Sequence, residues 1–159
     1  QQNDGHKGSA GGTAWPGSDR VVEFVQQPGP YTAMGWNIAP EGLEALLVPL
    51  SEPFPEQPPM GTENGAAFDD EVADDGSVHD RQRTDYLRRH FTAAHRALAR
   101  GVDLRGYFVW SLLDNFEWGY GYAKRFGIVR VDFDTLERTV KDSGHWYREL
   151  ARTGELPAP

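Results

Sequence analysis

Cysteine is absent from this sequence of 159 residues, and its absence excludes two kinds of structure. Without thiols the chain forms no disulfide framework and offers no thiolate ligand to a metal, so the fold must rest on packing alone. Long apolar runs are also absent, whereas a membrane-spanning helix needs about 18 apolar residues. The N-terminus lacks the charged and apolar regions of a signal peptide. We therefore expect a soluble chain in the cytoplasm.

Basic side chains are fewer than acidic ones. The chain has 16 Lys and Arg against 24 Asp and Glu, which gives a net charge of −8. A surface of this sign repels phosphate backbones and anionic lipids. We therefore expect neither nucleic acid nor a membrane as a partner. The length suffices for one domain, because a domain of this size buries roughly 70% of the surface that its unfolded chain exposes.

The front of the sequence has few apolar residues. Residues 1–13 are mainly Gly, Ser, Asn, Gln and Lys without apolar periodicity, so burial would not offset the entropy lost on ordering. A short extended piece is predicted at residues 21–25, between segments rich in Gly and Pro. We expect residues 1–30 to be a flexible surface loop region and residues 31–159 to hold the structured part.

Three segments show helical patterns. Residues 40–50 place four leucines on one face, and Pro49 is expected to end that helix. A second helix is predicted after Asp80 as its cap and before Gly101, where a helix usually stops. A third is predicted over residues 142–154.

Extended segments lie between these helices. Residues 60–64 read as a short strand, and residues 104–111 as a strand buried on both faces. A hairpin arm is predicted at residues 128–133, and the acidic stretch at residues 69–80 is either a lid or a solvated connector. The order helix, strand, helix, strand, helix is typical of a (β/α) barrel or a doubly wound sheet, in which the chemistry lies at the carboxyl ends of the strands.

Two short segments at these strand ends carry carboxylates. Thr62-Glu63-Asn64-Gly65 ends the first strand, and the run from Trp110 to Trp118 follows the second. Carboxylates beside aromatic and small polar residues are typical of a sugar-processing site. A complete barrel needs eight strand and helix pairs over roughly 250 residues, and this sequence supplies two. We therefore expect a part of a barrel or one piece of an assembly.

From about Trp15 to its end, the sequence resembles the C-terminal third of the bacterial family-one retaining β-glucosidases. The segments that carry the resemblance are Gly35-Trp36-Asn37-Ile38, Pro40-Glu41-Gly42-Leu43, the run from Thr62 to Phe68, the run from Gly106 to Trp118, Lys124-Arg125-Phe126-Gly127 and Lys141-Asp142-Ser143. Enzymes of this family are (β/α)8 TIM barrels that hydrolyse β-linked glucosides and related sugars. The resemblance implies an α/β fold made of the last two β/α units, strands 7 and 8 with their helices, after a loop and a helix.

The resemblance also implies roles for particular residues. Glu63 would be the catalytic nucleophile, which forms a covalent glycosyl-enzyme intermediate. Trp110 would offer a flat apolar face to the sugar, and Glu117 and the Trp118 indole N–H would hydrogen-bond its hydroxyls. Phe126 would pack nearby. Taken alone, Trp110 and Phe126 read as core residues, whereas a carboxylate among aromatics such as Glu117 needs partners, which sugar hydroxyls would supply.

The same segments narrow the substrate. Relatives that cleave phosphorylated glucosides carry Ser in place of Glu117 and a Lys-x-Tyr pattern for the phosphate, whereas here Lys124 is followed by Arg125-Phe126. Glu117 would repel a phosphate, so we expect an unphosphorylated β-glucoside or a short β-linked oligosaccharide as the substrate. Its glycone would be glucose, galactose or fucose.

No metal or other cofactor is implied. His79, His90 and His95 lie on or near the second predicted helix, but their spacing lacks the Glu partner of a zinc site. We expect surface or supporting roles for them.

One element of the family pattern is not in the sequence. Retaining hydrolysis needs a second carboxyl about 5–5.5 Å from the nucleophile, and the resembling enzymes carry it in a Thr-x-Asn-Glu-Pro-type motif that this sequence does not contain. The isolated chain is therefore expected to be inactive. Three alternatives follow: a β-glucosidase fragment, a subunit of a split enzyme that needs a complementary N-terminal barrel chain, or a non-catalytic carbohydrate-binding protein that uses Trp110, Glu117 and Trp118.

Overall fold

In the computed structural model, which describes residues 27–157, helices and strands alternate along most of the chain. The elements in order are α1 (Glu41–Ser51), β1 (Met60–Asn64), α2 (Arg81–Ala99), β2 (Gly106–Val109), the 3₁₀ turn η2 (Trp118–Tyr120), β3 (Val129–Val131), β4 (Arg138–Val140) and α3 (Asp142–Thr153). The expected order of helix, strand, helix, strand and helix is confirmed. The extended piece expected at residues 21–25 lies outside the described residues, as does most of the loop region expected at residues 1–30.

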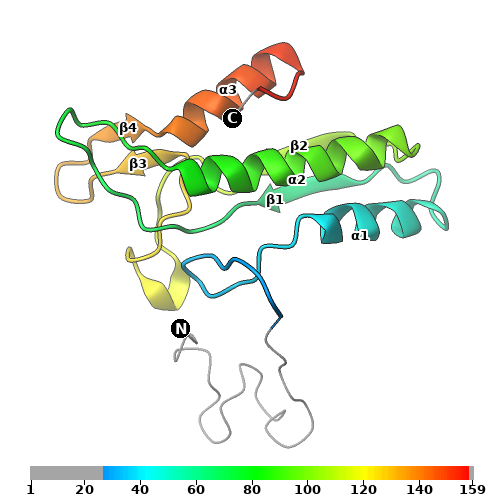
Figure 1. Cartoon of the computed structure of the whole chain (residues 1–159), viewed down its shortest axis with the longest axis horizontal. Coiled ribbons are helices and arrows are strands. Elements are labelled where there is room, and N and C mark those ends of the chain that lie inside the picture. The colour runs from blue at the N-terminus through cyan, green and yellow to red at the C-terminus, as the bar shows by residue number, and fades with distance from the viewer. Residues whose placement is uncertain (1–26, 158–159) are drawn as a thin grey trace, which may run out of the picture.

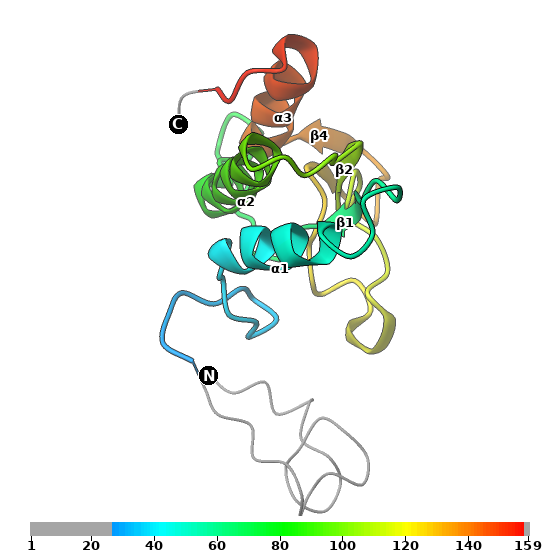
Figure 2. The same cartoon turned by 90° about the vertical axis from the view of Figure 1, so that its right-hand side faces the viewer.

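The two central strands form one βαβ unit. β1 and β2 are parallel neighbours in a two-stranded sheet, and α2 connects them. Figure 1 and Figure 2 show α1, α2 and α3 grouped on one side of these strands. β3 and β4 pair as an antiparallel hairpin just before α3, which confirms the hairpin arm expected at residues 128–133. Within residues 27–157, no helix combines the length and the apolar character needed to cross a membrane.

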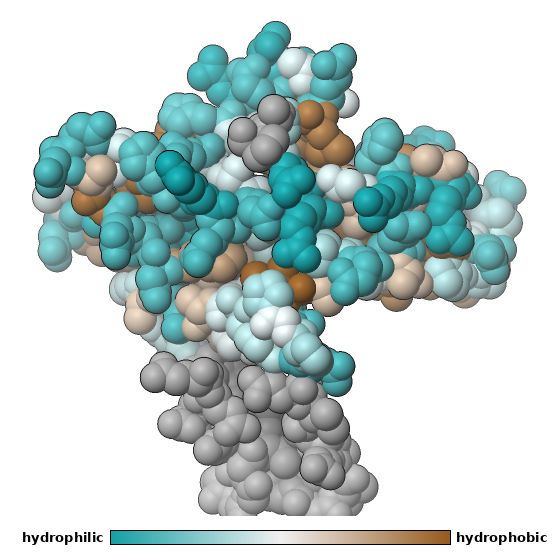
Figure 3. All heavy atoms as spheres, viewed as in Figure 1, coloured by the Kyte–Doolittle hydropathy of each residue, from teal (hydrophilic) through white to brown (hydrophobic). Residues whose placement is uncertain are grey.

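The core lies between α2, the two central strands and α3. Leu87 of α2 is inaccessible to solvent, and Trp146 of α3 is almost as deeply buried. The centroid of the Phe91 ring lies 4.4 Å from that of Tyr107 in β2 and 5.9 Å from that of Trp146. Burial of each large apolar side chain contributes about 1.5–3 kcal/mol, so these contacts fix both helices against the sheet. The outward face of the helices carries mainly hydrophilic side chains (Figure 3).

The end of α1 differs from the prediction. Pro49 does not terminate the helix, which continues to Ser51. A proline lacks the backbone N–H that would bond the preceding turn, but Pro49 lies so near the end of α1 that only two helical residues follow it. In addition, the Ser51 hydroxyl donates to the carbonyl oxygen of Val48 at 2.8 Å, which adds a bond within the last turn.

The start of α2 agrees with the prediction in position but not in bonding. Asp80 occupies the N-cap position before Arg81, yet its side chain makes no capping hydrogen bond to α2. Its carboxylate instead accepts the backbone N–H of Ser143 in the first turn of α3, at 2.8 Å. An N-cap bond can thus be supplied across the fold, because the acceptor needs only to lie near the free N–H groups.

The second strand is shorter and more exposed than expected. β2 spans four residues, Gly106–Val109, rather than the predicted 104–111. The expectation that it is buried on both faces is wrong for the described chain. Tyr107 packs on α2, but Phe108, which points to the other side, is 54% exposed, and Met60 of β1 is 52% exposed. Within residues 27–157 the helices cover only one side of this sheet.

Candidate active site

A pocket of about 250 Å³ lies at the carboxyl ends of β1 and β2. Its lining residues are Trp36, Glu63, Gly65, Trp110, Glu117, Trp118 and Phe126. The structure thus brings together all five candidates from the sequence, which are Glu63, Trp110, Glu117, Trp118 and Phe126. Sequence reasoning did not single out Trp36, because a tryptophan in an irregular segment gives no signal of what it faces.

A β-bulge in β1 explains why Glu63 reaches this pocket. Gly61 of β1 pairs with Tyr107 of β2, but Asn64, three residues later, pairs with Val109, only two residues later. β1 therefore contains one extra residue, which shifts the alternation of its side chains. Gly61 lies on the side of α2, and in a regular strand Glu63 would share that side. The bulge instead allows Glu63 to line the pocket.

The two strand ends approach each other closely at Gly65. A Cβ atom on this residue would lie 1.5 Å from the carbonyl oxygen of Trp110, so only glycine fits. One residue earlier, the Asn64 carbonyl accepts the backbone N–H of Trp110 at 2.8 Å. Asn64, which follows Glu63, is thus bonded to Trp110 directly after β2. This bond fixes the separation of Glu63 and Trp110 in the pocket.

The loop after β2 supplies the other acidic side chain. The backbone N–H of Glu117 donates to the Gly121 carbonyl at 2.7 Å, which holds a tight turn around η2. Glu117 is half-buried, whereas Trp118 is 83% exposed and has a positive φ of 40°. A tryptophan in this conformation is strained, and such strain is concentrated at functional sites.

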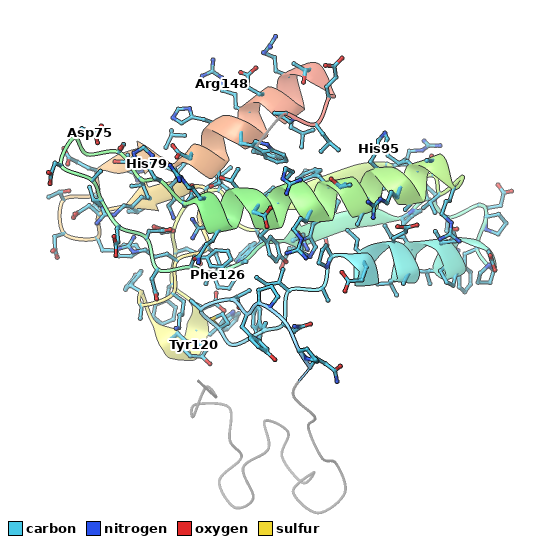
Figure 4. All side chains as sticks on the ribbon, in the orientation of Figure 1. Asp75, His79, His95, Tyr120, Phe126 and Arg148 are labelled. Carbon is cyan, nitrogen blue, oxygen red and sulfur yellow. The ribbon has the colours of Figure 1, made fainter. Side chains whose placement is uncertain are left out.

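The floor of the pocket is aromatic. Phe126 is only 3% exposed and packs with Met34 and Ala67. The Trp36 ring lies 6.0 Å from the Phe126 ring between centroids, and about half of Trp36 remains exposed. Figure 4 shows Phe126 in the interior, close to the loop that carries Tyr120. The pocket therefore combines an apolar floor with two carboxylates at its rim.

Six charged side chains join the segments around this pocket, and sequence reasoning did not find them as a group. They are Asp70, Asp80, Arg83, Asp114, Arg125 and Lys141, linked by ion pairs. We call them the charge cluster. Three acids balance three bases, as burial requires, because an unpaired buried charge is strongly destabilising.

Lys141 lies at the centre of the charge cluster. Its Nζ donates to the Asp70 carboxylate and, at 2.9 Å, to the Asp114 carboxylate, and all three side chains are inaccessible to solvent. Burial, followed by repulsion from Arg83, lowers the pKa of the Lys141 ammonium, while the bond to Asp70 and the charge of Asp114 oppose that shift. The acidic partners keep this buried lysine compensated.

Comparisons with known proteins identify the family. The model described as glycosyl hydrolase family 1 matches residues 7–156. The chain belongs to this family. It is 53% identical over 141 residues to a 1,4-β-D-glucan glucohydrolase of Thermotoga neapolitana, covering 89% of this chain and 32% of that protein. It is 52% identical over 133 residues to a bifunctional β-D-glucosidase/β-D-fucosidase of Bifidobacterium breve, covering 81% and 29%.

A solved structure agrees with these family 1 relatives. A family 1 β-glucosidase from Thermotoga maritima superimposes with a TM-score of 0.82 at 53% identity, covering 85% of this chain and 31% of that chain. The family 1 chain thus spans about a third of the length of the relatives it matches. Since family 1 β-glucosidases are TIM barrels, it has the fold of part of a TIM barrel.

The histidines within residues 27–157 lie away from the pocket lining. His79 and His95 are exposed, as expected, and Figure 4 shows His95 on the outer surface of α2. His90 is instead buried, because its ring stacks on Tyr86 at 3.9 Å and its Nδ1 bonds the Tyr86 carbonyl. Among residues 27–157, no group of three or more His, Cys, Asp and Glu side chains is arranged to hold a metal ion.

Proposed function

We propose that this family 1 chain is the C-terminal portion of a retaining β-glucosidase, with residues 31–159 forming the end of its barrel. β1 and β2 are then the seventh and eighth strands, α2 and α3 the helices that follow them, and α1 the helix that precedes them. Parallel pairing of β1 and β2 through α2 supports a β/α unit of a barrel, and the similarity to the β-glucosidase from Thermotoga maritima supports a TIM barrel.

Glu63 is the nucleophile in this proposal. Its carboxylate attacks the anomeric carbon of a bound β-glucoside while the bond to the aglycone breaks, which gives a covalent glycosyl ester. Water then attacks the same carbon and releases the sugar and the carboxylate, so the anomeric configuration is retained overall. The observation that carries the proposal is the pocket itself, where Glu63 and Glu117 lie among three tryptophans at the ends of two parallel strands.

The acid and base for this reaction would come from a complementary N-terminal part of the barrel. The carboxyl that protonates the aglycone oxygen lies about 5–5.5 Å from the nucleophile in retaining enzymes. The sequence contains no Asn-Glu-Pro motif to supply it. We therefore expect the isolated chain to lack turnover.

The other pocket residues would bind the sugar. The exposed indole of Trp110 offers a face for sugar C–H groups, and Phe126 forms the floor below it. Glu117 and the Trp118 indole N–H would hydrogen-bond the hydroxyls of the glycone. A carboxylate at position 117 disfavours a phosphorylated sugar by charge repulsion, so an unphosphorylated β-glucoside or a short β-linked oligosaccharide is the proposed substrate.

The uncovered side of the sheet supports the need for a complementary chain segment. Met60 of β1 and Phe108 of β2 are each about half exposed on that side. In a closed barrel such inward-pointing side chains fill the interior in packed layers. Further barrel strands would therefore bury this surface and complete the pocket at the same time.

The deciding experiment is hydrolysis of a chromogenic β-glucoside by the purified chain, alone and mixed with the N-terminal two-thirds of the Thermotoga maritima relative. Activity in the mixture alone is the expected result. Glu63→Gln should abolish it, because an amide does not form the glycosyl ester. Glu137→Gln is the matched control, because Glu137 is exposed in the turn before β4, and this variant should retain activity. Ordinary turnover by the Glu63→Gln mixture would overturn the nucleophile assignment.

Sugar binding without hydrolysis is the second candidate function. The 83% exposure of Trp118, beside Glu117 in an open pocket, favours a binding surface that acts even in the isolated chain. Saturable quenching of tryptophan fluorescence by glucose, lost on Glu117→Ala, would support this candidate. Absence of any response up to high glucose concentration would exclude it.

A further inference from the structure

The charge cluster connects the loop after β1 to the loop after β2. Lys141 Nζ binds Asp70 in the first loop and Asp114 in the second. Arg83 makes a second connection, since its Nη1 donates to Asp70 at 2.9 Å and its Nη2 to the Arg125 carbonyl at 2.8 Å. The first loop begins directly after the strand with Glu63, and the second contains Glu117, so the cluster joins the two halves of the pocket.

Asp114 also closes the loop that carries Glu117 and Trp118. Its Oδ1 accepts the backbone N–H of Gly127 at 2.9 Å, and its Oδ2 accepts that of Val131 at 3.4 Å. Both ends of the loop thus meet at one buried carboxylate, three residues before Glu117. A loop fixed at its base in this way has fewer conformations than an open surface loop.

We propose that Lys141 and Asp114 are positioning residues for the sugar pocket, and that through Asp70 they set the place of Glu117 relative to Glu63. This inference rests on the proposed function, because it concerns the same pocket. Neither Lys141 nor Asp114 lines the pocket, so both act through the loop backbones.

The physical basis is that a buried ion pair resists displacement more than an exposed one. Exposed pairs in water contribute little, since solvent and salt screen them. Here the ammonium of Lys141 and the carboxylates of Asp70 and Asp114 are inaccessible, so loss of one partner leaves an uncompensated charge. Catalytic and binding groups are sensitive to such shifts, because a misplacement of about 1 Å costs on the order of 100-fold in rate.

The first test measures amide hydrogen exchange in the full chain. Lys141→Met removes the bridge, and Lys141→Met with Asp70→Asn removes it while keeping the cluster balanced. In both variants, exchange at the Glu117 amide, which bonds the Gly121 carbonyl, should accelerate at least about tenfold, given the strength of buried pairs. The Leu87 amide in α2 should change much less. Unchanged exchange at Glu117, or equal acceleration at both amides, would overturn the proposal.

The second test measures kinetics of the same variants in the mixture with the N-terminal barrel part. The KM for the chromogenic glucoside should rise about tenfold, because the hydrogen bonds of Glu117 to the sugar are misaligned. Arg105→Met, which breaks the exposed pair with Asp103, is the matched control and should leave KM unchanged. An unchanged KM in the Lys141 variants would contradict the proposal.

The two tests separate this inference from the proposed function. If the wild-type mixture fails to hydrolyse the glucoside, the proposed function fails, and the exchange experiment alone decides whether Lys141 holds the loop. Accelerated exchange at Glu117 would then still support the connection that Lys141 makes between the two loops.

Discussion

The carboxylate of Asp80, which precedes α2, caps α3 by accepting the backbone N–H of Ser143 at 2.8 Å. The same carboxylate pairs with Arg83 and accepts the Ser143 hydroxyl. One side chain thus satisfies a free helix N–H, a buried guanidinium and a hydroxyl, and it ties the starts of two helices together.

Replacement of Asp80 by alanine should destabilise the chain by more than an ordinary cap. Loss of a cap costs about 1 kcal/mol, and removal of one partner from a buried ion pair about 3–5 kcal/mol, so we expect a loss of about 3 kcal/mol or more. Urea denaturation followed by circular dichroism measures it. Asp74→Ala, in an exposed turn, is the control and should leave the midpoint unchanged. Equal midpoints for both variants would contradict the role of Asp80.

Gly65→Ala should both destabilise the chain and reduce turnover in the reconstituted mixture. The added Cβ would lie 1.5 Å from the Trp110 carbonyl oxygen, so β1 and β2 must separate at the pocket. Overpacking typically costs about 1–3 kcal/mol, and a backbone contact yields less readily than a side chain. Gly42→Ala in α1 meets no atom within 4 Å and should be neutral or stabilising. Thermal melts of both variants test this, and a Gly65→Ala melt like that of the wild type would refute it.

His90 should make the chain less stable at mildly acidic pH. Burial is the largest cause that lowers the pKa of this imidazole below its ordinary 6.5, against an opposing bond to the Tyr86 carbonyl. Between the lowered pKa and 6.5 the unfolded chain binds more protons than the folded chain, so the free energy of unfolding falls as pH falls through this window. His90→Gln should reduce the difference in urea midpoint between about pH 7.5 and about pH 5. His95→Gln, on the exposed side of α2, should leave it as in the wild type, and identical behaviour of the two variants would count against the prediction.

Glu117→Ala should weaken binding of the glucoside more than it slows the chemical step. Hydrogen bonds to a charged group contribute about 1.5–3 kcal/mol, which corresponds to a rise in KM of about 10–100-fold. Steady-state kinetics of the reconstituted mixture measures the effect. Glu137→Ala is the control, because its side chain is exposed outside the pocket lining. A Glu117→Ala mixture with the wild-type KM would remove Glu117 from the binding site.

The elements that local signals delimit were predictable from the sequence. The strand expected at residues 60–64 matches β1. Its ends were predictable because prolines precede it and Gly65 follows it. The helix expected between Asp80 and Gly101 matches α2, which spans Arg81–Ala99. The position of the pocket also followed, since both candidate segments stand at the carboxyl ends of parallel strands.

The remaining features depend on contacts between distant segments. Lys141 and Asp70 are 71 positions apart, so no local pattern reveals that their side chains form a buried ion pair. The bulge before Asn64 depends on the register with β2, which the sequence of β1 alone does not set. The exposure of Phe108 reflects how little of the chain covers that side of the sheet, and the strand's own composition predicts the opposite.

The two-stranded sheet also bears on how the chain behaves when it is made alone. Among residues 27–157, β1 and β2 each pair along one edge only, so the other edges present free N–H and C=O groups. Such edges are templates on which an extended segment of another molecule adds, and exposed apolar residues like Met60 and Phe108 strengthen that tendency. In the proposed mixture with the N-terminal barrel part, self-association and barrel assembly would compete for the same edges, and the relative concentrations of the chain and that part would decide between them.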